Sequence, residues 1–203
     1  MDRRRVLSYV IGSNGAGKST LARNVLGHNV VPIKLEYGYL SVSEDNNTYA
    51  RTRGQIAAVG RYTSACGGVD TVKPLSNAYL LGQEAAAKFP NANIFMESLL
   101  MSELFSSPLK FLLEMKYKHG FDIEVCFLFA SMRESMRRVF GRNGGTPIKP
   151  KCVSDKLNAT TRNYKRIMEL GEFRGVAIDT TSITSDEVFR KFRNWSGLYE
   201  KNA

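Results

Sequence analysis

The feature of this sequence that most constrains its fold is a glycine-rich loop at residues 12–20. The loop reads Gly-Ser-Asn-Gly-Ala-Gly-Lys-Ser-Thr and fits the Walker A pattern GxxxxGK[ST]. An apolar run at 5–11 precedes it, and a stretch with helical spacing at 18–26 follows it. In this strand–loop–helix context, backbone N–H groups converge on phosphate at the start of a helix. The alternative is a glycine turn that happens to precede Lys-Ser, and the full match with both flanks disfavours it.

Each residue type in the loop has a chemical reason. Glycine lets the backbone adopt angles and approach phosphates in ways that a side chain would prevent. Lys18 places a positive charge against the β- and γ-phosphates of ATP, Ser19 offers a hydroxyl to Mg²⁺, and Thr20 could touch the α-phosphate. We therefore expect ATP and Mg²⁺ as cofactors. The expected ATP-binding residues are Gly12, Asn14, Gly15, Ala16, Gly17, Lys18, Ser19 and Thr20.

Beyond the loop, the chain alternates apolar runs with amphipathic stretches, which is typical of a three-layer α/β domain. We expect the P-loop NTPase and kinase fold, with a mainly parallel central sheet and an arginine-rich lid, in a single domain spanning residues 1–203. Strands are expected at 5–11, 93–97, 123–129 and 176–179, and in two β-rich runs at 30–40 and 55–62, with the polar stretch 43–53 as a hairpin tip. Helices are expected at 18–26, 76–88, 108–118, 131–140, 154–170 and 185–195.

Composition disfavours several other classes of protein. No apolar run approaches the ~18 residues of a membrane span, and the basic start at 1–5 is followed by an apolar stretch too short for a secretory signal. We therefore expect a cytoplasmic protein with no membrane partner. The 3 cysteines are widely spaced and form no CxxC pair, which argues against a zinc site or a disulfide framework.

An acidic residue ends the expected strand at 93–97. Glu97 at that point is typical of a Walker B position, where it would hold Mg²⁺ or accept the proton of an attacking hydroxyl. A surface acid at the end of a strand is the alternative. Glu97 is thus a candidate both for catalysis and for metal binding.

The segment 60–71 follows another apolar run and combines a Gly-Gly turn with basic, aromatic and acidic residues. Loops after strands are where α/β enzymes place substrate contacts. Arg61 is a candidate phosphate binder, Tyr62 could stack on a base, and Asp70 is a candidate general base. A structural turn closed by Asp70 is the alternative.

The net charge is +10, and most of the excess lies between Arg133 and Arg166, where ten Lys/Arg stand against two acids. Three glycines in 141–145 follow the arginines, so we expect a lid region at about 141–153, with Arg137 and Arg142 as catalytic members. Glu134 and Arg138 are interpreted as a surface ion pair. A solvated basic helix is the alternative for the whole segment. Residues 180–182, after the last strand, either line the nucleotide-base pocket or cap a helix.

Taken together, these motifs resemble the 5-hydroxymethyluracil DNA kinases of tailed bacteriophages. The matching pieces are 12–20, 60–62, 66–71 and 97–100, within a resemblance that runs from about Val6 to Asp179. The block Cys-Gly-Gly-x-Asp-Thr at 66–71 is the most specific, because nucleoside monophosphate kinases do not usually carry it. The chain departs from many small P-loop kinases at Ser98, where they have glycine after the acid.

This resemblance implies ATP-dependent phosphorylation of the 5-hydroxymethyl group of 5-hydroxymethyl-deoxyuridine in phage DNA, giving 5-phosphomethyl-deoxyuridine for thymidine hypermodification. It implies DNA as a partner and the cytoplasm of an infected host as the location. The basic segment fits such a polyanion. A small-molecule nucleoside or nucleotide kinase is the alternative, and a non-catalytic nucleotide-binding module is a third possibility. A GTPase is disfavoured because the sequence has no Asn-Lys-x-Asp motif for reading guanine.

Overall fold

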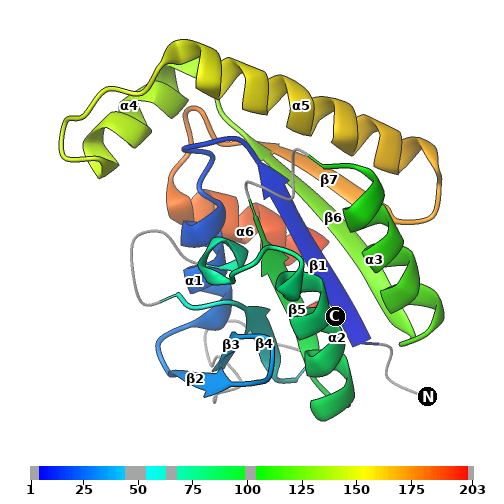
Figure 1. The fold of residues 1–203 in the computed structure, drawn as a ribbon. Helices are drawn as coiled ribbons and strands as arrows, with labels where there is room; N and C mark the ends of the chain where they lie inside the picture. Colours follow the sequence, from blue (N-terminus) through cyan, green and yellow to red (C-terminus); the bar gives the residue numbers. More distant parts are fainter. Residues whose placement is uncertain (1–4, 44–53, 63–67, 99–103, 201–203) are drawn as a thin grey trace.

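A seven-stranded sheet forms the centre of the molecule (Figure 1). The computed structural model describes residues 5–43, 54–62, 68–98 and 104–200. The strand order is β2-β3-β4-β5-β1-β6-β7. The strands are β1 (Arg5–Gly12), β2 (Val30–Lys34), β3 (Tyr39–Ser43), β4 (Ile56–Val59), β5 (Asn93–Glu97), β6 (Phe121–Phe129) and β7 (Arg174–Asp179). The helices are α1 (Lys18–Leu26), η1 (Val69–Thr71), α2 (Asn77–Lys88), α3 (Ser106–Tyr117), α4 (Met132–Arg142), α5 (Pro150–Glu169) and α6 (Ser185–Trp195).

Strand direction places the functional loops at one edge of the sheet. The neighbours from β4 through β5, β1 and β6 to β7 are all parallel, whereas β2, β3 and β4 pair antiparallel. The carboxyl ends of β4, β5, β1, β6 and β7 therefore meet at the same edge, which is where ligands bind in open α/β sheets. The expected three-layer α/β fold with a mainly parallel central sheet is confirmed.

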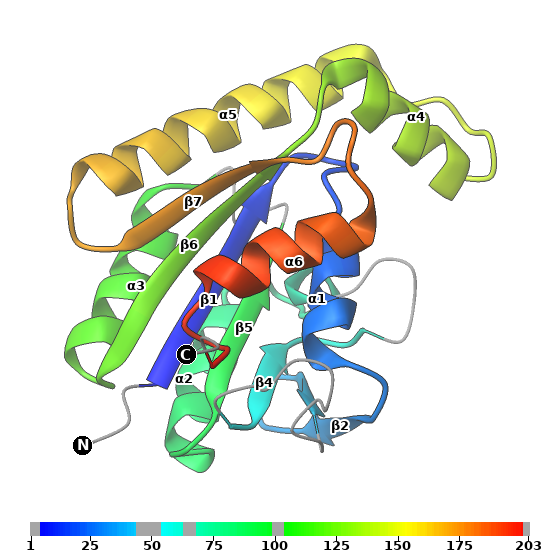
Figure 2. The same cartoon turned by 180° about the vertical axis from the view of Figure 1, so that it is seen from behind.

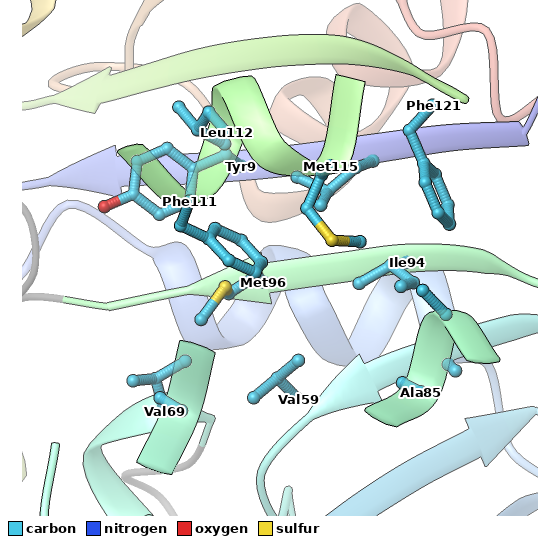
Figure 3. Close-up of a cluster of buried hydrophobic side chains, with 14 of the residues drawn as sticks. Tyr9, Val59, Val69, Ala85, Ile94, Met96, Phe111, Leu112, Met115 and Phe121 are labelled. Carbon is cyan, nitrogen blue, oxygen red and sulfur yellow. The ribbon is translucent and has the colours of Figure 1, made fainter. Parts of the chain in front are cut away.

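Two helical layers cover the sheet because its strands are apolar on both faces. In β1, Leu7, Tyr9 and Ile11 pack on the side of α2, α3 and α5, while Val6 and Val10 pack on the side of α1 and α6 (Figures 1 and 2). Figure 3 shows the first of these clusters, where side chains of α3 lie against those of β1 and β5. Each large apolar side chain buried in this way stabilises the fold by roughly 1.5–3 kcal/mol.

Several element boundaries differ from the sequence-based expectation. The run 30–40 is two strands, because the chain turns between them and Leu35 N–H donates to the Gly38 carbonyl at 2.8 Å. Helix α5 begins at Pro150 rather than 154, since proline is well suited to the first helical position. The expected lid region at about 141–153 therefore contains the end of α4, a loop at 143–149 and the first turn of α5. Of the expected hairpin tip at 43–53, all but Ser43 lies outside the described residues.

A buried carboxylate fastens the C-terminal segment to the sheet. Glu124 in β6 is 1% exposed and accepts hydrogen bonds from Ser196 Oγ at 2.6 Å and Gly197 N–H at 2.7 Å. It also pairs with the Arg174 guanidinium at 2.9 Å. These partners compensate the cost of burying the charge. No helix in the described parts of the chain is long and apolar enough to cross a membrane.

Candidate active site

The glycine-rich loop joins β1 to α1 at the carboxyl edge of the sheet, as the sequence predicted. Gly15 has φ 71°, and a Cβ placed on it would lie 2.8 Å from the backbone oxygen of Ser135 in α4. Only glycine allows the loop and α4 to meet backbone to backbone at this distance. Asn14 and Ala16 are buried beside it, and Gly17 starts the helix with φ 89°. The free N–H groups of the first turn of α1 therefore face the end of the loop.

Lys18 holds its ammonium group inside the loop. Its Nζ donates to the carbonyl oxygens of Gly12 at 2.9 Å and Ser13 at 3.0 Å, and the side chain is buried. Burial lowers the lysine pKa, while the carboxylates of Glu97 and Asp70 act to raise it. The ammonium is thus placed where phosphate oxygens can replace these two carbonyl contacts.

Ser19 and Glu97 connect the loop to the end of β5. Ser19 Oγ donates to Glu97 Oε1 at 2.8 Å, and Glu97 is 1% exposed. Burial raises the pKa of Glu97 to about 7, against the opposing charge of Lys18. A hydroxyl and a carboxylate side by side are hard oxygen donors of the type that Mg²⁺ prefers. The described residues contain no cluster of three or more His, Cys, Asp or Glu, so a magnesium ion here would take its other ligands from nucleotide phosphates and water.

The segment 68–71 packs directly against this acid. Gly68 has φ 71° and ψ −148°, and a Cβ on it would lie 2.5 Å from Glu97 Oε1 and 2.8 Å from the hydroxyl of Tyr62. Asp70 accepts a hydrogen bond from Ser98 Oγ at 3.1 Å. The structure therefore brings Asp70 and Glu97 to one place beside Lys18. Residues 63–67, including Cys66 and Gly67 of the specific block, lie outside the described residues, as do 99–103.

Arg61 and Tyr62 point in different directions from the end of β4. The Arg61 guanidinium lies 3.5 Å from the centre of the Tyr39 ring. The Tyr62 ring is 8% exposed within the cluster under α1, which leaves little of its surface for the base stacking expected of it. Its hydroxyl is buried and has no hydrogen-bond partner among the described residues, although it lies beside Glu97. Tyr62 thus offers the site a hydroxyl rather than an aromatic surface.

The arginines of α4 take unequal positions. Arg137 is 72% exposed and binds Glu134 through two hydrogen bonds of 2.6 and 2.8 Å. Arg138 also binds Glu134, at 2.7 Å, but reaches across to the Gly15 carbonyl at 3.1 Å and the Thr180 carbonyl at 2.6 Å. These two guanidinium groups lower the pKa of Glu134 to about 2. In this conformation Arg138 touches the phosphate loop, whereas Arg137, predicted as a catalytic member of the lid, is paired with Glu134.

Comparison with known proteins gives one curated relative. No family model matches the chain. The 5-hmdU DNA kinase of Pseudomonas phage PaMx11 is 25% identical over 181 residues, covering 84% of this chain and 89% of that protein. This chain is a phosphotransferase similar to that phage kinase. The resemblance stated from the motifs is thereby confirmed.

The phosphotransferase also aligns with solved structures along most of its length, at low similarity. Deoxyadenosine kinase from M. mycoides with bound dATP is 14% identical, with a TM-score of 0.46, over 94% of this chain and 98% of that one. The same enzyme with bound dCTP is 16% identical with a TM-score of 0.44, over 93% and 97%. An uncharacterised protein from Eubacterium ventriosum is 9% identical with a TM-score of 0.47, over 94% and 98%.

A cavity of about 240 Å³ lies beside the phosphate loop of this phosphotransferase. Its lining residues come from the loop, α1, α4, the segment between β7 and α6, and the first turn of α6, and they are Ala16, Gly17, Thr20, Leu21, Arg138, Thr180, Ile183, Ser185 and Val188. Thr180 belongs to the segment expected either to line a base pocket or to cap a helix. Thr180 lines the cavity, and the capping of α6 is done by Thr184 with Glu187.

Sequence reasoning missed several cations of the site. Arg138 was interpreted as one half of a surface ion pair, yet it shares the inner side of α4 with the buried Ser135 and Val139, three residues before it and one after. Lys156 in α5 was not singled out, but its charge lowers the pKa of Lys18, as does that of Arg142. Arg142 and Lys156 therefore both act electrostatically on the phosphate site from the corner between α4 and α5.

Proposed function

We propose that this protein transfers the γ-phosphoryl group of ATP to the 5-hydroxymethyl group of 5-hydroxymethyl-deoxyuridine in DNA, giving 5-phosphomethyl-deoxyuridine and ADP. The observation that carries the proposal is the contact of Gly68 and Asp70 with the end of β5. These residues belong to the block that marks the phage kinases, and they pack against the acid that faces the phosphate loop. In the proposed enzyme this segment would face an acceptor hydroxyl bound beside the phosphate loop.

Nucleotide binding follows from the loop. Lys18 would exchange its contacts with the carbonyls of Gly12 and Ser13 for the β- and γ-phosphates. Ser19 and Glu97 would hold Mg²⁺, which neutralises phosphate charge when bound. The ATP base would occupy the 240 Å³ cavity lined by Arg138 and Thr180.

Asp70 is the stronger candidate for the general base, because Glu97 would be committed to Mg²⁺. A carboxylate that holds Mg²⁺ is a poor proton acceptor, whereas Asp70 lies beside Glu97 and accepts a hydrogen bond from Ser98 Oγ at 3.1 Å. In the proposed step the O–H bond of the acceptor breaks and its proton passes to Asp70. The acceptor oxygen forms a bond to the γ-phosphorus, and the bond from that phosphorus to the bridging β–γ oxygen breaks.

The corner between α4 and α5 would act as the lid, corresponding to residues 141–153. Arg142 and Lys156 already act on Lys18 from this corner, and added positive charge stabilises the phosphoryl group in flight. Arg137 would join only if its pair with Glu134 opened. A lid that covers the site also excludes water as a competing acceptor.

The proposal is tested by following γ-labelled phosphate from ATP onto a duplex that contains 5-hydroxymethyluracil, with a thymine duplex and the free nucleoside as parallel acceptors. We expect label on the modified duplex alone, and none with Lys18→Ala, whose near-ultraviolet circular dichroism should match the unaltered protein. Transfer to the free nucleoside but not to DNA would instead support a small-molecule kinase. Hydrolysis of ATP without transfer to any acceptor would support a nucleotide-dependent switch.

A further inference from the structure

Helix α5 carries two separate sets of cations. Lys156 acts on Lys18 and so belongs to the side of the helix that influences the phosphate site. Lys151, Arg162 and Lys165 are exposed on the solvent side. Figures 1 and 2 show α5 lying along the outside of the fold, with α4 and the connecting loop projecting at one end. The mechanism above uses the first set and leaves the second without a role.

The outer set continues into the corner beside the site. We name as the basic track four exposed residues, Lys149, Lys151, Arg162 and Lys165. Within the described residues none of the four forms an ion pair, whereas Arg137 and Arg138 are both paired with Glu134. The two exposed acids of α5, Asp155 and Glu169, leave the outer surface with a net positive charge. Such a surface attracts a polyanion and holds little for an apolar partner.

The length of the track matches several phosphates of a duplex. Lys151 and Lys165 are fourteen positions apart, which is roughly 21 Å along a helix. A DNA duplex rises about 3.4 Å per base pair, so this length spans about six base pairs of backbone charge. Contacts of this kind position a protein on DNA without reading the sequence.

We propose that the basic track binds the phosphate backbone of duplex DNA and so holds the polymer whose modified base is phosphorylated. This inference rests on the proposed function for the choice of DNA as the polyanion. It adds the surface that would make a DNA polymer a better acceptor than a free nucleoside. The inner cations of the corner serve ATP, and the outer cations serve the acceptor strand.

The test is the salt dependence of binding to a labelled thymine duplex, measured by fluorescence anisotropy with the full chain. Each phosphate contact contributes about 0.9 to the slope of log K against log salt, which corresponds to a factor of about 8 at 0.1 M. The double variant Arg162→Gln with Lys165→Gln should therefore lower the slope by about 1.8 and the affinity by up to about 60-fold. The matched control is Arg190→Gln with Lys191→Gln, two exposed cations on α6, on the opposite face of the sheet from α5 (Figure 2).

The outcomes separate the surface from the function. A lower slope in the α5 variant, with the α6 control unchanged and both variants unfolding at the temperature of the unaltered protein, supports the track. An α5 variant with the slope of the unaltered protein, or an equal fall in the control, overturns it. Should the unaltered protein bind DNA through α5 yet transfer no phosphate to hydroxymethyluracil DNA, the proposed function fails while the track stands. If the unaltered protein transfers phosphate normally and the α5 variant has the slope of the unaltered protein, the track fails while the proposed function stands.

Discussion

Replacing Gly68 by alanine should disable the site with limited loss of stability. The added methyl group would lie 2.5 Å from Glu97 Oε1 and 2.8 Å from the Tyr62 hydroxyl. Ordinary contacts of a Cβ begin near 3.4 Å, so the carboxylate must retreat by about 0.9 Å. The backbone at φ 71° and ψ −148° is also a conformation that only glycine adopts readily.

The size of the effect follows from these two changes. Misplacing a catalytic group by about 1 Å can cost about 10²-fold in rate, so we expect kcat to fall by about that factor, equivalent to about 2.7 kcal/mol. The strained backbone should cost about 1–3 kcal/mol in the free energy of unfolding. At this chain length each kcal/mol lowers the melting temperature by about 2–4 °C.

The assay compares Gly68→Ala with Gly120→Ala. Gly120 has φ 70°, but a Cβ there would meet no atom within 4 Å, so the control shares the positive φ without the collision. Phosphate transfer and thermal unfolding are measured for both variants. We expect the control to lose stability while keeping its rate. A Gly68→Ala protein that transfers phosphate within threefold of the unaltered rate would refute the placement of this segment against Glu97.

Three further predictions concern neighbouring side chains. Arg138→Ala should raise KM for ATP about tenfold, because it removes charged hydrogen bonds to the Gly15 and Thr180 carbonyls. The matched variant Arg137→Ala, at an exposed side chain, should change KM by less than about twofold. Equal changes of KM in steady-state kinetics would contradict this geometry. Tyr62→Phe should leave the melting temperature unchanged or raise it, since the lost hydroxyl has no hydrogen-bond partner among the described residues. We expect kcat to fall about tenfold in the same variant. A lower melting temperature with a normal kcat would show that the hydroxyl is structural. Without metal and nucleotide, the raised pKa of Glu97 means that the folded state binds this proton more tightly than the unfolded state, so the stabilising contribution is full below pH 4.5 and is lost as the pH rises to about 7. Urea unfolding in chelator should show this fall, and Glu97→Gln should remove it; a variant with the same pH dependence would assign the titration to another group.

The parts of the fold and site that could be predicted were those fixed by local chemistry. The pattern Gly-x-x-x-x-Gly-Lys-Ser requires a strand before it and a helix after it, and α1 begins and ends where expected, at Lys18 and Leu26. Glu97 could be placed because a short apolar run ends at it. Asp70 could be placed near the site because its segment follows another strand of the same sheet. Their catalytic roles remain predictions.

The parts that could not be predicted depend on tertiary packing. Arg137 and Arg138 are adjacent and chemically equal, and only the docking of α4 on the phosphate loop decides which one reaches Gly15. The aromatic ring of Tyr62 looked suitable for stacking until the packing of α1 buried it. Lys156 acts on Lys18 because α5 packs across the sheet, a tertiary contact that the local sequence does not reveal.

The meeting of Gly15 and Ser135 has a mechanical consequence. Because the two backbones touch and Arg138 ties the same turn of α4 to Thr180, the first two turns of α4 form one rigid piece with the glycine-rich loop. Any swing of the corner must therefore pivot beyond Val139, where Gly141 lies in the last turn of α4 and Gly144 and Gly145 lie in the loop that follows. The lid would then open and close by bending at these glycines, while the first two turns of α4 keep the same position against the glycine-rich loop.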